Sequence, residues 1–199
     1  NKDKTKTTLI KMDSITRTKK SQKVTIVGAV VDFLLSVFKV IVGVIGNSGA
    51  LVADGVHSFS DLLTDWVTWY AAKQAGEAPD KEHPYGHERF ETVATLGLSI
   101  FLAIIGTAII FDAMGRLTNT GALNHEVWLI ATAGLSIVSK EALYWYTVIV
   151  AKNINSEMLK ANAWHHRSDA FSSVVVIIGI VGAINGYYYL DSAAAIIVG

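Results

Sequence analysis

Two histidine–aspartate pairs with the same spacing stand in two apolar stretches of the chain. His57 and Asp61 lie in GALVADGVHSFSDLLTDWVTWYAA, and His165 and Asp169 lie in ANAWHHRSDAFSS. A spacing of four residues places both side chains of a pair on one helix face, one turn apart. Two imidazoles and two carboxylates can form a tetrahedral shell, which suits Zn²⁺, whereas Mg²⁺ and Ca²⁺ prefer oxygen ligands. The two pairs therefore predict a metal site, provided that their helices meet.

The elements that must position these pairs are long apolar helices. The chain is 51% hydrophobic and has a mean hydropathy of +0.39. A membrane-spanning helix needs roughly 20 mainly apolar residues. Such segments cover about 24–45, 49–72, 92–111, 127–150 and 157–184, and another begins near residue 189. The sequence predicts an all-α membrane protein, a bundle of six transmembrane helices whose sixth is cut off at Gly199. We expect a basic cytoplasmic arm over 1–23 and a cation-transport domain over 24–199.

Basic residues set the expected orientation in the membrane. They are concentrated in the arm and in the second and fourth connections, whereas the opposite side carries only Arg116. By the positive-inside rule, the N-terminus is cytoplasmic. We expect an integral, multi-pass protein of a bacterial inner (plasma) membrane, with the lipid bilayer as its surroundings. A net charge of zero gives no reason to expect nucleic acid as a partner, and the absence of cysteine excludes thiolate metal sites.

The depth of each pair can be worked out from the helical rise of about 1.5 Å per residue. His165 and Asp169 lie roughly 12–18 Å from the cytoplasmic start of their helix, and Asp61 lies about 18 Å from the cytoplasmic end of its own. Because these two helices run in opposite directions, all four side chains can meet near the membrane midplane. The alternative is that each pair is a hydrogen bond within its own helix.

Other polar residues in the apolar segments have less specific interpretations. Asp54 is expected to cap its helix, and Asp65 to line an exit path. Asp32 and Lys39 are expected to face a polar interior, where Lys140 and Glu141 could pair with them or with each other. His166 and Arg167 are expected to contact neighbouring helices, with His166 as a ligand in the alternative interpretation.

The connection APDKEHPYGHERFE contains a second candidate site. Asp80, His83 and His87 are all potential metal ligands, and Pro84 and Gly86 favour a turn between the two histidines. Three ligands in a tight turn could form a partly open metal site. The alternative is a polar loop whose histidines bind nothing.

The motifs SGALVADGVHSFSD, HPYGHERFE and ANAWHHRSDAFSS resemble those of the cation diffusion facilitator family, in that order and over about 20–199. The resemblance implies a six-helix, homodimeric exporter of divalent transition metals, driven by proton influx. It implies a transport site at His57, Asp61, His165 and Asp169 and a second site at Asp80, His83 and His87. In this family the His–Asp–His–Asp version of the transport site is associated with zinc. Members generally carry a C-terminal cytoplasmic metal-binding domain, which these 199 residues do not include.

The predicted function is therefore a divalent metal/proton antiporter, with Zn²⁺ as the main substrate, working by alternating access. Alternatives are a family member that carries Fe²⁺, Cd²⁺, Co²⁺ or Mn²⁺, and a passive cation channel or a metal-sensing membrane protein. An enzyme is not expected, because catalytic zinc keeps one position open beside three protein ligands, and here four ligands converge.

Overall fold

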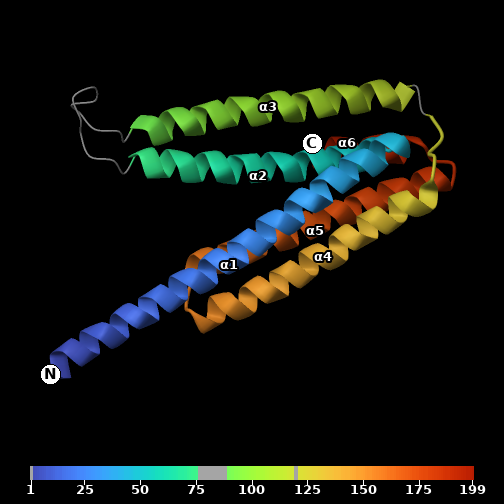
Figure 1. Ribbon diagram of the computed structural model, residues 1–199. Coiled ribbons are helices and arrows are strands. Elements are labelled where there is room, and N and C mark those ends of the chain that lie inside the picture. Colours follow the sequence, from blue (N-terminus) through green and yellow to red (C-terminus); the bar gives the residue numbers. More distant parts are fainter. Residues whose placement is uncertain (1, 76–88, 119–120) are drawn as a thin grey trace.

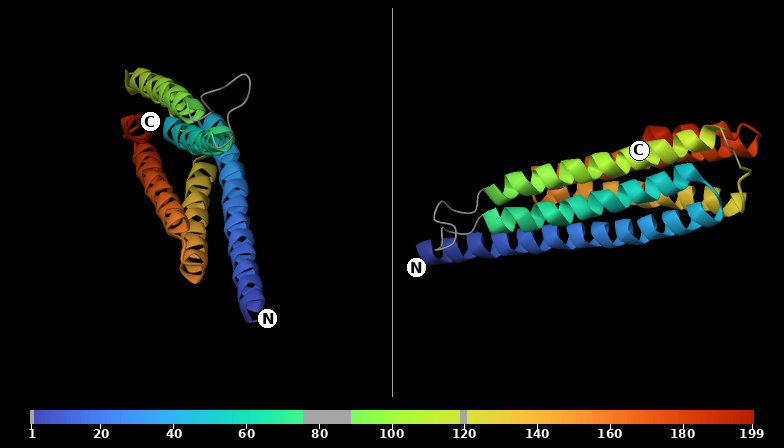
Figure 2. Two further views of the ribbon diagram at one scale, coloured as in Figure 1. Left: turned by 90° about the vertical axis from the view of Figure 1, so that its left-hand side faces the viewer. Right: turned by 90° about the horizontal axis from the view of Figure 1, so that it is seen from above.

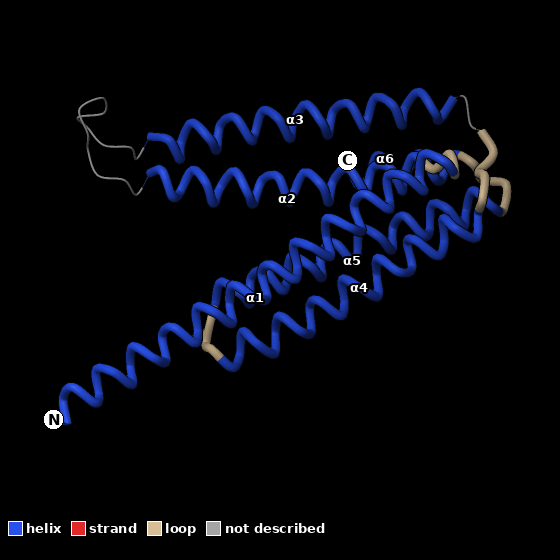
Figure 3. Tube along the Cα trace, in the orientation of Figure 1, coloured by secondary structure: helices blue, strands red, loops and turns tan. Residues whose placement is uncertain are grey.

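The computed structural model describes residues 2–75, 89–118 and 121–199. Every regular element in these ranges is an α-helix (Figures 1 and 3). The helices are α1 (Lys2–Ile45), α2 (Gly49–Ala75), α3 (Arg89–Thr118), α4 (Glu126–Asn153), α5 (Glu157–Ile184) and α6 (Tyr189–Val198). The all-α prediction is confirmed, and each expected apolar segment lies within one helix.

Helix α1 begins well before the apolar segment that predicted it. It runs without a break from Lys2 through the expected boundary at residue 23. The first 23 residues contain neither proline nor glycine, the two residues that most disfavour a helix interior. The basic arm and the first apolar segment therefore share one helical backbone.

The helices form a bundle with α3 on its outside (Figures 1 and 2). Helices α4 and α5 pack antiparallel along their length, joined by the short connection after Asn153, and α1 packs against both α2 and α4. Helix α2 also contacts α5, which brings the two His–Asp helices together. Among the described helices, α3 packs mainly against α2 and α6, and the apolar window within residues 92–117 is 6% buried. A helix without a polar face that is so little covered by protein is suited to contact with lipid.

Within the described ranges, four helices are long and apolar enough to cross a membrane. They are residues 19–45 of α1, residues 92–117 of α3, the whole of α4 and the whole of α5. Helix α6 is apolar but has only ten residues, and α2 is not among the four. Helix α2 contains Asp54, His57, Asp61 and Asp65, which lower its hydropathy. The six-span topology and the cytoplasmic N-terminus therefore stay predictions.

Close approach of α1 and α2 depends on small residues. A Cβ added to Gly43 would lie 2.8 Å from the backbone nitrogen of Val52, and one added to Gly55 would lie 2.7 Å from Cγ2 of Val40. Both distances are too short for a real side chain. Gly43 of α1 and Gly55 of α2 thus allow these two helices to pack closely.

The N-terminus of α2 is capped from α6. Asp191 accepts hydrogen bonds from the backbone N–H groups of Gly49 at 2.7 Å and Ala50 at 3.3 Å and from the Ser48 hydroxyl at 2.5 Å. A carboxylate in this position satisfies N–H groups that have no partner within the helix. The expectation that Asp54 caps α2 is therefore wrong, because Asp54 lies a full turn inside the helix and pairs elsewhere.

Candidate metal-transport site

Each His–Asp pair lies on one face of its helix, as the spacing predicts. On α2, His57 Nε2 lies 3.7 Å from Asp61 Oδ2, and on α5, His165 Nδ1 lies 3.8 Å from Asp169 Oδ1. Both distances exceed the range of a hydrogen bond. The structure therefore does not contain the alternative arrangement, in which each His–Asp pair forms a hydrogen bond within its own helix. The imidazole nitrogens and carboxylate oxygens that face each other keep their capacity to bind an ion.

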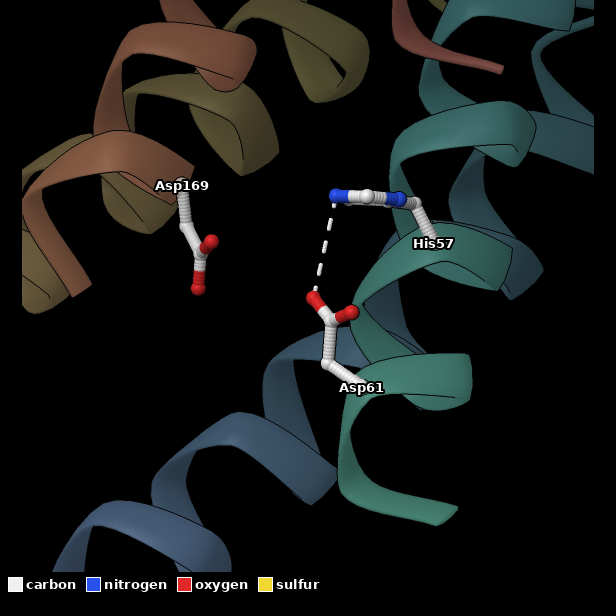
Figure 4. A group of neighbouring side chains, drawn as sticks. All are labelled: His57, Asp61 and Asp169. Atoms are coloured by element: carbon white, nitrogen blue, oxygen red, sulfur yellow. Dashed lines mark ion pairs between the residues drawn. The ribbon is translucent and has the colours of Figure 1, made fainter. Parts of the chain in front are cut away.

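The two pairs approach each other across the bundle. His165 Nε2 lies 3.9 Å from Asp61 Oδ2, so the two helices meet at the level expected from their antiparallel direction. His57, Asp61 and Asp169 each offer one ligand atom within 4.8 Å of the others. Figure 4 shows Asp169 facing His57 and Asp61 from the opposite side of the gap. His165 stands outside this group of three, but lies within 4 Å of both carboxylates.

The side chains at the site differ in their contact with solvent. Asp169 is 5% exposed and Asp61 26%, whereas His57 is 41% and His165 43% exposed. Within the described part of the chain, Asp61 Oδ2 is buried and accepts no hydrogen bond. A buried carboxylate oxygen without a donor is costly unless a cation or proton reaches it. This oxygen lies near both imidazoles and is therefore the strongest geometric sign of a cation position.

A cavity of about 390 Å³ borders the candidate site. Asp61, His165 and Asp169 line its inner end, and Thr25, Trp69 and Asn162 line the part nearest the arm of α1. Asp65 also lines this cavity, in agreement with the expectation that it borders a path to the site. The lining thus extends from the candidate site toward the end of the bundle at which the basic arm lies.

On the other side of the site, a buried polar cluster fills the space between helices. Lys39 of α1 and Asp54 of α2 form an ion pair, with Nζ 2.8 Å from Oδ2, and their side chains are 0% and 1% exposed. Ser173 of α5 donates a hydrogen bond to Asp54 Oδ2 at 2.9 Å, and Lys39 also reaches the hydroxyls of Ser58 and Ser173. The expectation that Lys39 faces a polar interior is met.

Lys140 of α4 adds a cation directly beside the candidate site. Its Nζ donates a hydrogen bond to Asp169 Oδ2 at 2.7 Å and lies 2.7 Å from Asp32 Oδ1. Of the partners that the sequence left open for Lys140, the structure selects Asp32 and adds Asp169, which sequence reasoning missed. Glu141 instead accepts a hydrogen bond from Trp145 at 3.1 Å.

The charges around the site balance those of a divalent ion. Metal binding requires neutral imidazoles and ionised carboxylates. In that state Asp32, Asp61 and Asp169 carry three negative charges and Lys140 one positive charge, which leaves a local charge of −2. A dication would make the buried group neutral, and this lowers the cost of holding charge in a low dielectric.

His166 and Arg167 contact neighbouring groups, as expected. His166 is 4% exposed, and its Nδ1 lies 3.6 Å from Asp32 Oδ2 on α1. The Arg167 guanidinium lies 4.7 Å from the ring centre of Tyr144 on α4, a cation–π distance. Neither joins the group formed by His57, Asp61 and Asp169. The second predicted site, at Asp80, His83 and His87, lies outside the described residues and stays a prediction.

The fold and the site together define an integral membrane protein built of apolar helices, whose interior holds imidazoles and carboxylates. Residues 25–199 match the family described as the cation efflux transmembrane domain. The chain belongs to this family, which confirms the resemblance to the cation diffusion facilitators.

Several relatives carry names that refer to metals. The chain is 36% identical over 192 residues to metal tolerance protein C1 of Arabidopsis thaliana, covering 89% of this chain and 41% of the relative. It is 38% identical over 177 residues to an uncharacterized transporter of Methanocaldococcus jannaschii, covering 89% and 62%. It is 30% identical over 188 residues to a manganese efflux system protein of Bacillus subtilis, covering 94% and 65%. The chain therefore spans about two fifths to two thirds of the length of these relatives.

Proposed function

We propose that this protein exports divalent transition metal ions, with Zn²⁺ as its main substrate, in exchange for protons. The ion binds between α2 and α5, to His57, Asp61, His165 and Asp169. The observation that carries this proposal is the meeting of two His–Asp pairs from antiparallel helices, with Asp61 Oδ2 within 4 Å of both imidazoles.

Ligand chemistry supports zinc above the other candidates. Two nitrogens and two carboxylate oxygens suit the tetrahedral coordination of Zn²⁺. Co²⁺, Fe²⁺ and Cd²⁺ accept the same donor types, and Mn²⁺ favours sites richer in oxygen. The name of the Bacillus subtilis relative makes Mn²⁺ the alternative substrate to compare first.

The cavity supports a carrier that opens to one side at a time. Its lining extends from the site toward the end of the bundle that carries the basic arm, which the positive-inside rule assigns to the cytoplasm. In the other direction, Lys39, Asp54 and Ser173 occupy the space between the helices. This arrangement corresponds to a cytoplasm-facing state, from which ions would load. Release on the far side then requires the Lys39–Asp54 cluster to separate, as α2 and α5 move together against the other helices.

Proton exchange follows from the ligands. A metal ion displaces protons from imidazole and carboxylate groups when it binds, and protons displace the ion when it leaves. Proton uptake from the outer side would then drive metal release there. A channel or a metal sensor is the alternative class. Channels usually line their pores with rings of like groups, whereas the proposed site is a single cluster of two histidines and two aspartates. A homodimer and a loop site at Asp80, His83 and His87 belong to the same proposal.

The proposal is tested with the purified protein in proteoliposomes under an imposed pH gradient. We expect saturable Zn²⁺ transport that stops when the gradient is collapsed, and that is lost in Asp61→Ala and in His165→Ala. The matched control is Asp112→Asn, because Asp112 is an exposed aspartate of α3, a helix that contributes no residue to the described lining of the cavity. Wild-type transport by both site variants would show that the site assignment is wrong. Flux that does not saturate and ignores the gradient would favour the channel.

A further inference from the structure

Lys140 is a buried cation in direct contact with one side chain of the candidate site. Its side chain is 2% exposed and lies between Asp32 of α1 and Asp169 of α5. A lysine ammonium is stable in such a place only when it is paired. A positive charge beside a cation site nevertheless repels the substrate, so its position there calls for a functional reason.

The two oxygens of the Asp169 carboxylate have different partners. Oδ2 accepts the hydrogen bond from Lys140 Nζ at 2.7 Å. Oδ1 lies 3.8 Å from His165 Nδ1 on the side of the site. Asp61 differs in this respect, because its Oδ2 faces both imidazoles and accepts no hydrogen bond within the described residues. Of the two carboxylates, only Asp169 thus has one oxygen held by a cation.

Asp32 keeps Lys140 in place from the opposite side. Asp32 Oδ1 lies 2.7 Å from Nζ, and Asp32 belongs to α1, whereas Asp169 belongs to α5. Rotation of the Asp169 carboxylate to offer both oxygens to one ion would break its bond to Lys140. The ammonium could not follow, because its second ion pair ties it to α1.

We propose that Lys140 is a specificity-determining residue that restricts Asp169 to binding an ion through one oxygen, Oδ1. Four ligands that each give one atom complete a tetrahedral shell and favour Zn²⁺. Ions that prefer six or more ligands, such as Mn²⁺, gain from a carboxylate that binds through both oxygens. Lys140 therefore disfavours these larger coordination shells. This inference rests on the proposed transport site at His57, Asp61, His165 and Asp169.

The test compares equilibrium binding of Zn²⁺ and Mn²⁺ to the purified protein in detergent, by isothermal titration calorimetry. Lys140→Met keeps the length of the side chain and removes the ammonium. We expect the ratio of Zn²⁺ to Mn²⁺ affinity to fall at least about tenfold, as for other groups that orient a metal ligand. Because this variant leaves Asp32 buried without its partner, Lys140→Met combined with Asp32→Asn is measured as well and should show the same fall.

Lys39→Met is the matched control. Lys39 is equally buried and paired with an aspartate, but it contacts none of the four proposed ligands. It should leave the affinity ratio unchanged, even if the protein becomes less stable. An unchanged ratio in both Lys140 variants, together with loss of Zn²⁺ binding in Asp61→Ala, would overturn the role of Lys140 and leave the site intact. Wild-type Zn²⁺ binding by Asp61→Ala would instead overturn the site, and the role of Lys140 with it.

Discussion

Asp61 of α2 and His165 of α5 face each other across the bundle, with Oδ2 and Nε2 3.9 Å apart. They are 104 positions apart in the sequence, as the numbering 61 and 165 gives. This contact joins the two His–Asp pairs into one cluster. It is also the contact that a metal ion would replace with two coordination bonds of about 2 Å each.

Asp61→Asn should weaken Zn²⁺ binding at least about 100-fold, beyond the effect usual for groups that only orient a ligand. The amide keeps the shape of the side chain but removes the charge of the oxygen that faces both imidazoles. Titration calorimetry in detergent measures this loss of affinity. Asp65→Asn should bind Zn²⁺ within about threefold of wild type, because solvent and salt screen the charge of an exposed carboxylate. Equal losses of Zn²⁺ affinity in both variants would show that Asp61 acts through the overall negative charge of the cavity and not as a metal ligand.

Metal binding should weaken as the pH falls. Free imidazole side chains take up protons around pH 6.5, and a protonated imidazole cannot bind a metal. The expected sign is therefore tighter Zn²⁺ binding at about pH 7.5 than at about pH 5.5, with net proton release into the buffer on binding. Calorimetry in two buffers of different ionisation enthalpy measures the number of protons released. Binding heats that do not depend on the buffer would contradict proton exchange at the site.

The Lys39–Asp54 pair should contribute strongly to stability. Removal of one partner of a buried ion pair costs about 3–5 kcal/mol, because the other charge is left unpaired. Lys39→Met should therefore lower the apparent melting temperature in detergent, and Lys39→Met combined with Asp54→Asn should recover much of the loss. Lys152→Met, at an exposed lysine, serves as control and should leave the melting temperature close to that of wild type. Equal melting temperatures for Lys39→Met and Lys152→Met would contradict the role of the pair.

The parts of the structure that follow from periodicity and length could be predicted from the sequence. Each helix covers its expected apolar segment, and Asp61 and His165 are level because helical rise and antiparallel direction fix their depths. The contact between Lys140 and Asp169 can be predicted in the same way. Lys140 lies 14 residues before Ile154 and Asp169 lies 13 residues after Ser156, so both are at about the same distance from the short α4–α5 connection.

Contacts that depend on how helices rotate and cross could not be predicted. Asp54 lies near the start of α2, where its position in the sequence predicts a cap. It instead pairs with Lys39 because Gly43 and Gly55 allow α1 and α2 to pack closely. The actual cap, Asp191, belongs to α6, which is distant in the sequence. No local pattern in either segment specifies that pairing, because it arises only when α6 packs against α2.

The close packing of α1 and α2 leads to a prediction about glycine. Gly43→Ala should destabilise the protein by about 1–3 kcal/mol, the usual cost of overpacking, because the new Cβ would lie 2.8 Å from the Val52 nitrogen, a backbone atom that cannot easily move. Gly134→Ala is the matched control. It lies within α4, where an added Cβ meets nothing within 4 Å in the described structure, and alanine is the better helix former by about 1 kcal/mol.

Apparent melting temperatures in detergent should therefore shift in opposite directions, down for Gly43→Ala and up or unchanged for Gly134→Ala. Gly43 lies one turn along α1 from Lys39, on the side away from the proposed metal site. The Gly43→Ala variant should therefore also separate α1 from α2 beside the Lys39–Asp54 cluster. A Gly43→Ala protein as stable as the Gly134→Ala protein would show that α1 and α2 are not in close contact at this point. That result would also contradict the proposal that the Lys39–Asp54 cluster closes the far side of the site, because this proposal requires α1 and α2 to pack closely there.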